Sequence, residues 1–312
     1  MKVVFLTLIF LVSISVIPLS FATTESCQCV AFRLDDVQDY WLNSVQTKII
    51  DTFHEKNASL TIGIIGNHIG QDPKIIDDIK SNLGKNPKLE IANHGWNHED
   101  FTQFSKEQQY VFMKNTNEKI NSLFGTVPSV FIPPFNTINS DTMSAFLENN
   151  FQIISANTTE DPGPYFIKNS AVYHFPGTAK TGNLNDENTY WYSENHRQTF
   201  AEIMDSLQKY GYATVVMHPQ EYSVRNALNY SNIVDESQIS ELELLIDEIR
   251  NDGLKIVTIS DIPKHITNQI IPNWTNHLFN WYVERKITEN EVYNAMKFLI
   301  KQEVVKFDSD NT

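Results

Sequence analysis

The sequence predicts an α/β fold in which a mainly parallel sheet is covered by helices. Short apolar runs alternate with amphipathic stretches along most of the chain, as strands and helices do in such folds. Polar residues suited to catalysis follow several of the apolar runs, which is where parallel sheets place their active sites. Both a closed barrel and a doubly wound sheet fit this alternation.

The first half of the chain shows the alternation most regularly. Pro73 suits the first turn of a helix, and Ser105 and Gln108 have the spacing of a capping box. Gly125 falls just past the end of the helix that Ser105 begins, where glycine ends many helices. We expect strands at residues 30–34, 60–65, 89–92 and 129–132, and helices at about 40–56, from 73, at 105–123 and at 140–149.

The second half is less regular. Residues 161–194 contain Pro, Gly and Asn, so we expect loops around a single strand at 171–175. The remaining expected strands are 151–155, 213–217 and 255–259, and the expected helices are 194–210 and 236–252.

The composition changes from about Ile271, where two or three small helices are predicted after a Pro-marked junction. We therefore divide the chain into a signal peptide (1–22), a mature N-terminal tail (23–29), a catalytic domain (30–267) and a small helical C-terminal module (268–312).

His94 and His98 are candidate metal ligands. A protein with nine histidines contains such a pair by chance often enough that the spacing alone is weak. Gly95 between them indicates a turn at the end of a strand rather than a long helix. With a carboxylate after another strand, two imidazoles match the ligands of a catalytic divalent ion.

Asp35 and Asp36 close the first expected strand. One Asp at such a place is often a helix cap, but two consecutive carboxylates repel each other unless a cation or a raised pKa relieves them. Because successive residues of a strand point in different directions, one carboxylate can bind metal while the other faces the substrate.

His218 ends an apolar run and is a candidate acid. The alternative is a buried histidine with its hydrogen bonds satisfied. Of the other histidines only His174 also ends an expected strand, which makes it the next candidate.

Taken together, these stretches resemble the polysaccharide deacetylase family (carbohydrate esterase family 4) over roughly residues 30–262. The segments that carry the resemblance are Phe32-Arg33-Leu34-Asp35-Asp36, His94 to His98, Pro133-Pro134-Phe135 and Met217-His218. The resemblance implies an irregular (β/α)7 barrel, with the small C-terminal helical appendage outside it.

The resemblance also implies roles for the matching residues. Asp36, His94 and His98 would bind a divalent metal, zinc or a similar ion. Asp35 would be the base that takes a proton from water, and His218 the acid that protonates the departing amine. These roles agree with the needs of amide hydrolysis.

The remaining matching residues would contact the substrate. Pro134 and Phe135 would bind it, and Met217 would line the acetyl pocket. Pro133 and Pro134 have no N–H, so Phe135 offers the first backbone donor of this turn, and we expect it to stabilise the oxyanion.

The sequence departs from the family pattern in three places, which makes it a divergent member. The family usually has an Arg at the position of Ile132 that holds the catalytic Asp. Arg33 lies two residues before Asp35, on the same side of the strand, and we expect it to compensate. The fourth motif, which tunes the acid His, has no clear copy, and Asp161 is the candidate for it. Val37 replaces the usual Gly.

The sequence therefore predicts a secreted, metal-dependent hydrolase acting on an N- or O-acetylated carbohydrate. A metal-containing glycan-binding protein without turnover is the main alternative, which Ile132 favours and the joint presence of Asp35 and His218 disfavours. A non-haem iron oxygenase also uses two His and one carboxylate, but has no need of an additional base and acid.

The N-terminal segment predicts export. Lys2 precedes an apolar stretch, and Ser20-Phe21-Ala22 fits a cleavage site. A membrane anchor is the alternative, but the stretch is short and interrupted for a spanning helix. We expect a secreted or cell-surface protein with no stable membrane insertion after cleavage. The C-terminal module would contact the cell surface or serve as a structural cap.

The charge balance disfavours one class of partner, and the cysteines and glycosylation triplets concern the chain itself. The 24 basic and 38 acidic residues disfavour nucleic acid. A disulfide between Cys27 and Cys29 would be strained, and the sequence leaves their role open, with a disordered mature N-terminus as the simplest interpretation. Glycosylation acceptor triplets, which matter only if the host glycosylates exported proteins, begin at Asn57, Asn157, Asn229 and Asn273.

Overall fold

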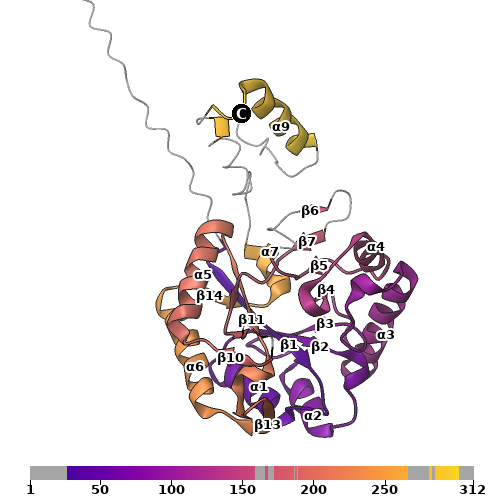
Figure 1. The fold of residues 1–312 in the computed structure, drawn as a ribbon, viewed down its shortest axis with the longest axis vertical. Helices are drawn as coiled ribbons and strands as arrows, with labels where there is room; N and C mark the ends of the chain where they lie inside the picture. Colours follow the sequence, from indigo (N-terminus) through magenta and orange to yellow (C-terminus); the bar gives the residue numbers. More distant parts are fainter. Residues whose placement is uncertain are drawn as a thin grey trace, which may run out of the picture.

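The computed structural model describes residues 27–158, 166–167, 172–185, 187, 189–265, 281–282 and 285–301 (Figure 1). The predicted signal peptide, Asp161 and most of the C-terminal module lie outside these residues. No helix in the described ranges is long and apolar enough to cross a bilayer.

One ten-stranded sheet organises the described part of the chain. Its order is β6-β7-β5-β4-β3-β2-β1-β11-β8, with β14 beside β1. Neighbours are parallel except for β6 and β7. The strands are β1 (Cys29–Val37), β2 (Leu60–Ile64), β3 (Leu89–Asn93), β4 (Val130–Phe131), β5 (Ile153–Ile154), β6 (Phe166–Ile167), β7 (Val172–His174), β8 (Ala179–Lys180), β11 (Ala213–Met217) and β14 (Lys255–Val257).

One continuous segment joins β5 and β11, which lie near the two ends of this order. Residues 172–180 pair with β5 through β7 and with β11 through β8. Between these pairings, Gly177 forms a parallel bridge with Asn157. The ring therefore consists of β1 to β5, this segment and β11, which confirms the irregular seven-membered barrel and excludes the open doubly wound sheet.

Helices surround the strands, with α3 and α4 on one side, α5 and α6 on the opposite side and α1 and α2 below (Figure 1). The helices are α1 (Asn43–Glu55), α2 (Pro73–Asn82), α3 (Lys106–Phe124), α4 (Ser140–Glu148), α5 (His196–Tyr210), α6 (Glu236–Asn251), α7 (Ile262–His265) and α9 (Glu289–Lys301). Short 3-10 helices are η1 (Gly66–His68), η2 (Phe101–Gln103), η3 (Pro134–Asn136), η4 (Pro219–Tyr222) and η5 (Ile259–Asp261).

The helix signals in the sequence are confirmed. Pro73 opens α2. Ser105 and Gln108 form both hydrogen bonds of a capping box at the start of α3, and Gly125 ends it in the left-handed conformation. These local contacts fix where α3 begins and ends.

The central strands β1 and β2 are buried on both faces. Phe32 and Leu34 of β1 pack in the layer under the helices with residues such as Phe53. Ala31 of β1 packs inside the barrel with Ile132. Burial on both faces explains why the strands appear in the sequence as continuous apolar runs.

Two expectations for the loops were wrong. Residues 172–193 hold further short strands beyond the one expected, β8, β9 (Gly182–Leu184) and β10 (Trp191–Ser193). A hairpin of β12 (Ser223–Asn226) and β13 (Asn229–Val234) was not predicted. The strands of this hairpin are mostly exposed, so they carry no alternation of buried and polar residues.

The assignment of residues 27–29 to a disordered tail was also wrong. Cys27 and Cys29 form a disulfide, both are buried, and Cys29 is the first residue of β1. Both pack in the apolar interior of the barrel, so this end of the chain belongs to the folded domain.

Candidate active site

The Asp pair lies within β1 rather than after it. The register of β1 against β2 shifts between Leu34 and Val37, which marks a bulge at the two aspartates. Asp36 has a positive φ of 61°, an unusual conformation for a non-glycine residue. The bulge breaks the strict alternation of the strand and lets both carboxylates reach the same end of the barrel.

Asp36, His94 and His98 form one cluster. Asp36 Oδ1 lies 3.2 Å from His94 Nε2 and 3.1 Å from His98 Nε2. The three ligand atoms all lie within 4.8 Å of one another. Ligands held about 2.0–2.1 Å from one ion in a tetrahedron would lie roughly 3.3 Å apart, so the cluster fits a single small divalent ion.

The surroundings of the cluster also suit a metal. His94 Nδ1 donates to the Ile132 carbonyl at 2.8 Å, which leaves Nε2 with its lone pair toward Asp36. Gln220 Nε2 donates to the other Asp36 oxygen at 3.2 Å. Burial opposes the charge of Asp36, but the hydrogen bonds with His94 and His98 hold its pKa well below the usual range. The carboxylate therefore stays ionised, as a ligand must.

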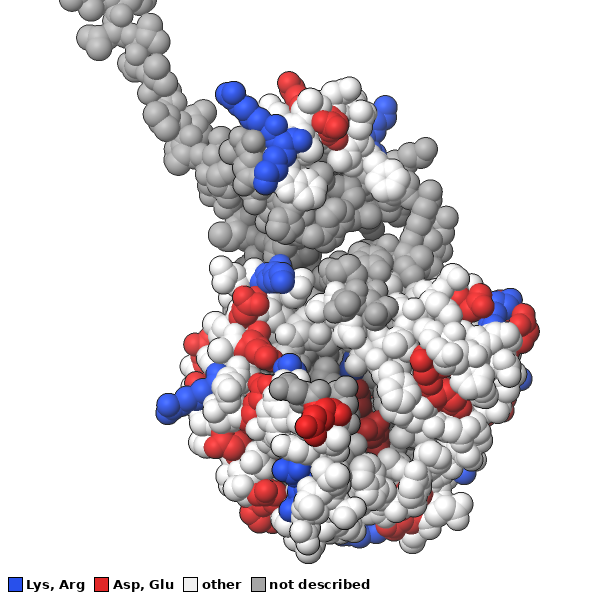
Figure 2. All heavy atoms as spheres, viewed as in Figure 1, with Lys and Arg blue, Asp and Glu red and all other residues white. Residues whose placement is uncertain are grey.

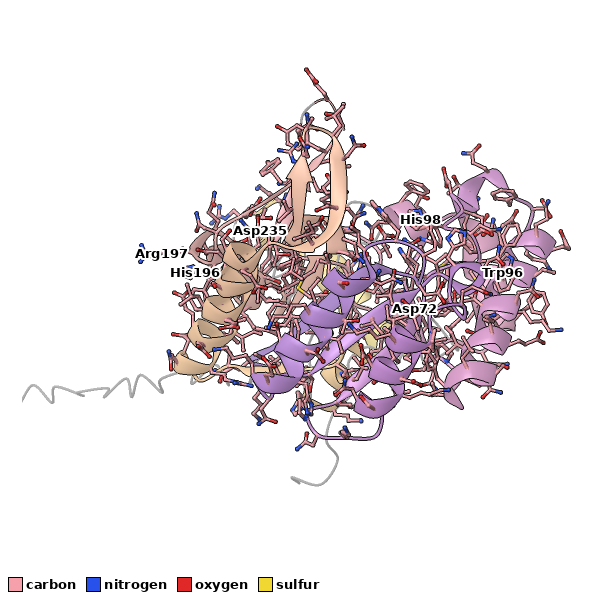
Figure 3. The ribbon with its side chains drawn as sticks, turned by 90° about the horizontal axis from the view of Figure 1, so that it is seen from below. Asp72, Trp96, His98, His196, Arg197 and Asp235 are labelled. Carbon is pink, nitrogen blue, oxygen red and sulfur yellow. A yellow bond between two sulfur atoms is a disulfide. The ribbon has the colours of Figure 1, made fainter. Side chains whose placement is uncertain are left out.

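The loop between the two histidines requires its glycine. Gly95 has φ 76°, and a Cβ there would lie 3.0 Å from both Glu99 and Pro134. Glu99 ties the loop by accepting from the backbone N–H groups of Trp96 and Asn97. Figure 3 labels Trp96 and His98 of this loop.

Arg33 and Asp35 form a buried ion pair. Arg33 Nη2 lies 2.8 Å from Asp35 Oδ2 and 2.9 Å from Asn136 Oδ1, and Nη1 donates to the Ser155 carbonyl at 2.6 Å. Arg33 is fully buried, so these contacts fix its position. Asp35 Oδ1 is buried without a hydrogen-bond partner. One oxygen of Asp35 is thus held, and the other is free to accept a proton.

His218 lies beside this pair at the end of β11. Its Nε2 is 4.0 Å from Asp35 Oδ2, and its Nδ1 is 3.1 Å from Glu221 Oε1. The Trp191 ring lies against the imidazole, with centroids 4.0 Å apart. Burial alone would lower the pKa of His218, but the bond to Glu221 and the charge of Asp36 raise it above the ordinary value. The imidazolium form, which a general acid needs, is favoured.

The turn at η3 presents a backbone donor. Phe135 has φ 57°, and its ring packs 4.7 Å from that of His98. The Asn136 N–H is used by the Pro133 carbonyl at 3.0 Å, and Pro134 has no N–H. Phe135 N–H is therefore the donor that this turn leaves available. The Phe135 side chain is exposed while Pro134 is buried beside Gly95, so of these two only Phe135 offers a substrate contact.

The position expected for Met217 was wrong. Met217 is fully buried in the layer under the helices, where Tyr222 Oη contacts its sulfur at 3.5 Å. The preceding residue, Val216, lines the groove instead. Side chains alternate along β11, so the residue before the catalytic end of the strand faces away from the groove.

A groove of about 890 Å³ leads away from the site. Asn136 and His218 of the site line it together with Asn157, Lys180 and, on α5, Glu202. Its size suits a small molecule or part of a polymer. On the face drawn in Figure 2, acidic and basic side chains of the described residues are interspersed.

Three residues of the site escaped the sequence analysis: Gln220, Glu221 and Trp191. Glu221 follows His218 by three residues, and that short spacing was the signal that could have identified it. His174, the second candidate acid, is buried in β7 and is not part of the cluster of titratable side chains around Asp36.

Solved structures share the fold. A putative polysaccharide deacetylase from Mycobacterium smegmatis is 17% identical, with a TM-score of 0.56, 80% of this chain and 93% of that chain covered. The Bc1960 peptidoglycan N-acetylglucosamine deacetylase is 16% identical, with a TM-score of 0.52 and coverage of 75% and 87%. A mutant of BA3943, a CE4 family pseudoenzyme with restored enzymatic activity, is 14% identical, with a TM-score of 0.50 and coverage of 75% and 67%.

Residues 22–154 match the family model described as polysaccharide deacetylase. The sequence of this segment is therefore similar to that of the polysaccharide deacetylase family. No curated protein matches the sequence. At such low identity the likeness to solved structures shows the barrel alone, and the similar structures include a pseudoenzyme mutant. Whether this chain turns over a substrate depends on the residues of its site.

Proposed function

We propose that this chain is a polysaccharide deacetylase, an exported, divalent metal-dependent enzyme that removes acetyl groups from an N- or O-acetylated carbohydrate. One observation carries the proposal. The metal cluster, the unpartnered oxygen of Asp35 and the imidazole of His218 converge at one end of the barrel, beside a groove.

Asp36, His94 and His98 would hold the ion, most readily Zn²⁺, which accepts one carboxylate and two imidazoles and keeps a position open. An ion held there lowers the pKa of a water molecule and polarises the acetyl carbonyl. The buried, hydrogen-bonded position of His94 and the ionised state of Asp36 support this assignment.

Asp35 would act as the base. Its Oδ1 is free to take a proton from the attacking water, while Arg33 fixes Oδ2. Arg33 would thereby take the role that an Arg at the position of Ile132 has in the family. Water then adds to the carbonyl carbon, and the Phe135 N–H is placed to stabilise the oxygen that becomes negative.

His218 would act as the acid. As the bond from carbon to nitrogen breaks, its Nε2 donates a proton to the nitrogen, which leaves as an amine. The same proton serves the oxygen of a departing alcohol when an O-acetyl group is cleaved. Glu221 on the far side of the ring supports the protonated form.

The proposal is tested by acetate release from acetylated oligosaccharides, using zinc-loaded protein recovered from the culture medium. Mass spectrometry of that protein should place its N-terminus just after Ala22. Asp35→Asn should reduce acetate release by about 10²- to 10⁴-fold, and His94→Ala should abolish zinc binding and turnover together. Asp77→Asn and His54→Ala, at exposed positions on the helices, are the matched controls and should behave as wild type.

Two outcomes contradict the proposal. Glycan binding with no acetate release from any substrate in the zinc-loaded wild type would favour a binding protein. Retention of the protein in the cells with residues 1–22 uncleaved would contradict export.

A further inference from the structure

Glu221 is the carboxylate in contact with the outer nitrogen of His218. Its Oε1 lies 3.1 Å from His218 Nδ1 and also accepts the His218 backbone N–H at 3.1 Å. The Glu221 side chain has no exposed surface. A buried carboxylate that receives both N–H groups of one histidine holds the backbone and the ring of that residue together.

The second oxygen of Glu221 is held from another part of the chain. Thr181 Oγ1, which follows β8, donates to Glu221 Oε2 at 2.5 Å. A Cβ on the neighbouring Gly182 would lie 2.6 Å from the carboxyl carbon of Glu221, so only glycine leaves room for it. Ser193 donates to the Glu221 carbonyl at 2.5 Å. Residues at the end of β8 and in β9 and β10 therefore surround Glu221 and fix its position.

The fourth motif of the family, which would supply a carboxylate to tune the acid His, has no clear copy in this sequence. Among the described residues, the carboxylates whose oxygens lie within 4.0 Å of the His218 ring are Asp35, on the Nε2 side, and Glu221, on the Nδ1 side. Because Asp35 faces the reacting groups, Glu221 is the one placed to orient the ring from behind.

We propose that Glu221, fixed by Thr181 and Gly182, is the positioning residue of His218: it keeps the proton on Nδ1 and aims Nε2 at the leaving nitrogen. This rests on the proposed function. A ring that donates from Nδ1 presents Nε2 as the nitrogen that exchanges its proton with the substrate. Trp191, packed against the ring face, blocks rotation of the imidazole.

If Glu221 had only a structural role, its substitution would have a different effect. Glu221 also forms a capping box with His218 at the start of η4, and that alone would stabilise the turn without affecting proton transfer. Glu221→Gln separates the two roles, because the amide oxygen can still accept both N–H groups while the negative charge is lost.

The experiment compares wild type with Glu221→Gln, Thr181→Val and the exposed control Glu107→Gln, all zinc-loaded. Each protein is assayed with an N-acetylglucosamine oligomer, whose amine must be protonated to leave, and with 4-nitrophenyl acetate, whose leaving group needs no acid. The ring pKa of His218 is measured by NMR on histidine-labelled protein, with the signal assigned by its loss in His218→Ala.

We expect Glu221→Gln to lower kcat for the N-acetyl oligomer by roughly 10- to 100-fold with little change in KM. Its activity towards 4-nitrophenyl acetate should stay within about twofold of wild type, because that leaving group needs no acid. The alkaline limb of the pH profile and the pKa of His218 should both move about one unit lower, because the stabilising charge is gone. Thr181→Val should show the same pattern more weakly, and Glu107→Gln none of it.

Equal losses on the two substrates, or a His218 pKa that does not move in Glu221→Gln, would overturn the proposal and leave Glu221 a structural cap. If wild type releases no acetate from either substrate, the proposed function fails. The NMR titration still decides the role of Glu221 in that case, because it does not depend on turnover.

Discussion

Arg33 is the residue that we propose to compensate for the Arg missing at position 132. Its guanidinium is fully buried and bridges Asp35, Ser155 and Asn136, which come from three separate segments. A buried charge without its partner costs about 3–5 kcal/mol, so removing either Arg33 or Asp35 alone should destabilise the protein. Arg33 thus combines a structural role with that of orienting Asp35.

Arg33→Lys should lower turnover while leaving zinc bound. Lysine keeps the positive charge, but a point charge cannot reproduce the fork that holds Asp35 and Ser155 at once. We expect kcat to fall by roughly 10- to 100-fold, in the range typical of residues that orient catalytic groups, with zinc content unchanged by elemental analysis. Arg250→Lys, an exposed change of the same kind, is the control. Full turnover in Arg33→Lys would show that Asp35 needs no such fork.

The residues of the site differ in how far the sequence could identify them. Arg33 followed from the two-residue period of a strand, because positions 33 and 35 share a side. The same rule should have excluded Met217, which lies on the face of β11 opposite to Val216. Glu221 reaches His218 through a 3-10 turn whose shape depends on Thr181 and Gly182, residues about forty positions away. The three-residue spacing from His218 was a local signal of this contact, but it did not give the geometry.

At the scale of elements, β2, β3 and η5 meet around one acidic group. Glu90 on β3 accepts from Thr61 Oγ1 of β2 at 2.8 Å and from the Ser260 N–H of η5 at 3.2 Å. Burial raises its pKa above the ordinary value, although these hydrogen bonds partly oppose that effect. The folded protein therefore binds the proton of Glu90 more tightly than the unfolded chain does.

Glu90→Gln should stabilise the protein at high pH and have little effect at low pH. The folded pKa is raised, so the stability contributed by Glu90 is fully present below the unfolded pKa of about 4.3 and is lost as pH rises through the folded pKa. The variant stays uncharged and keeps an oxygen for both donors. Thermal unfolding should give a midpoint a few degrees above wild type at pH 8 and no difference near pH 4. Glu107→Gln should show no such trend, and a destabilised Glu90→Gln at pH 8 would mean that the charge is needed.

Element boundaries followed from local signals wherever the chain supplied them. The capping box and terminal glycine of α3 defined it to within a residue or so. The hairpin β12–β13 stands out from the body in Figure 3 and buries little surface, so no alternation marked its strands. β1 ran past its expected end because a bulge, rather than a turn, carries the Asp pair.

The closed barrel is a property of the whole molecule. It depends on residues 172–180 pairing with β5 at one end and β11 at the other, and the sequence does not show which sheet edges meet. Closure also brings β1, the loop after β3 and the turn at η3 to one place. The cluster of Asp36, His94 and His98, to which β1 and the loop after β3 contribute, is therefore a product of folding, and the proposed metal ion should in turn stabilise the fold.

Zinc should raise the unfolding temperature of the whole protein, and the two adjacent aspartates should differ in this respect. Free zinc at 100 times its dissociation constant adds about 2.7 kcal/mol to stability, which corresponds to roughly 5–10 °C for a domain of this size. Calorimetry with zinc and then with a chelator measures the shift. Asp36→Asn should lose it, because a ligand is removed, whereas Asp35→Asn should keep it, because Asp35 contacts Arg33 and lies outside the cluster. An equal loss in both variants would show that Asp35 also binds the ion, and the separate roles of base and ligand would then have to be abandoned.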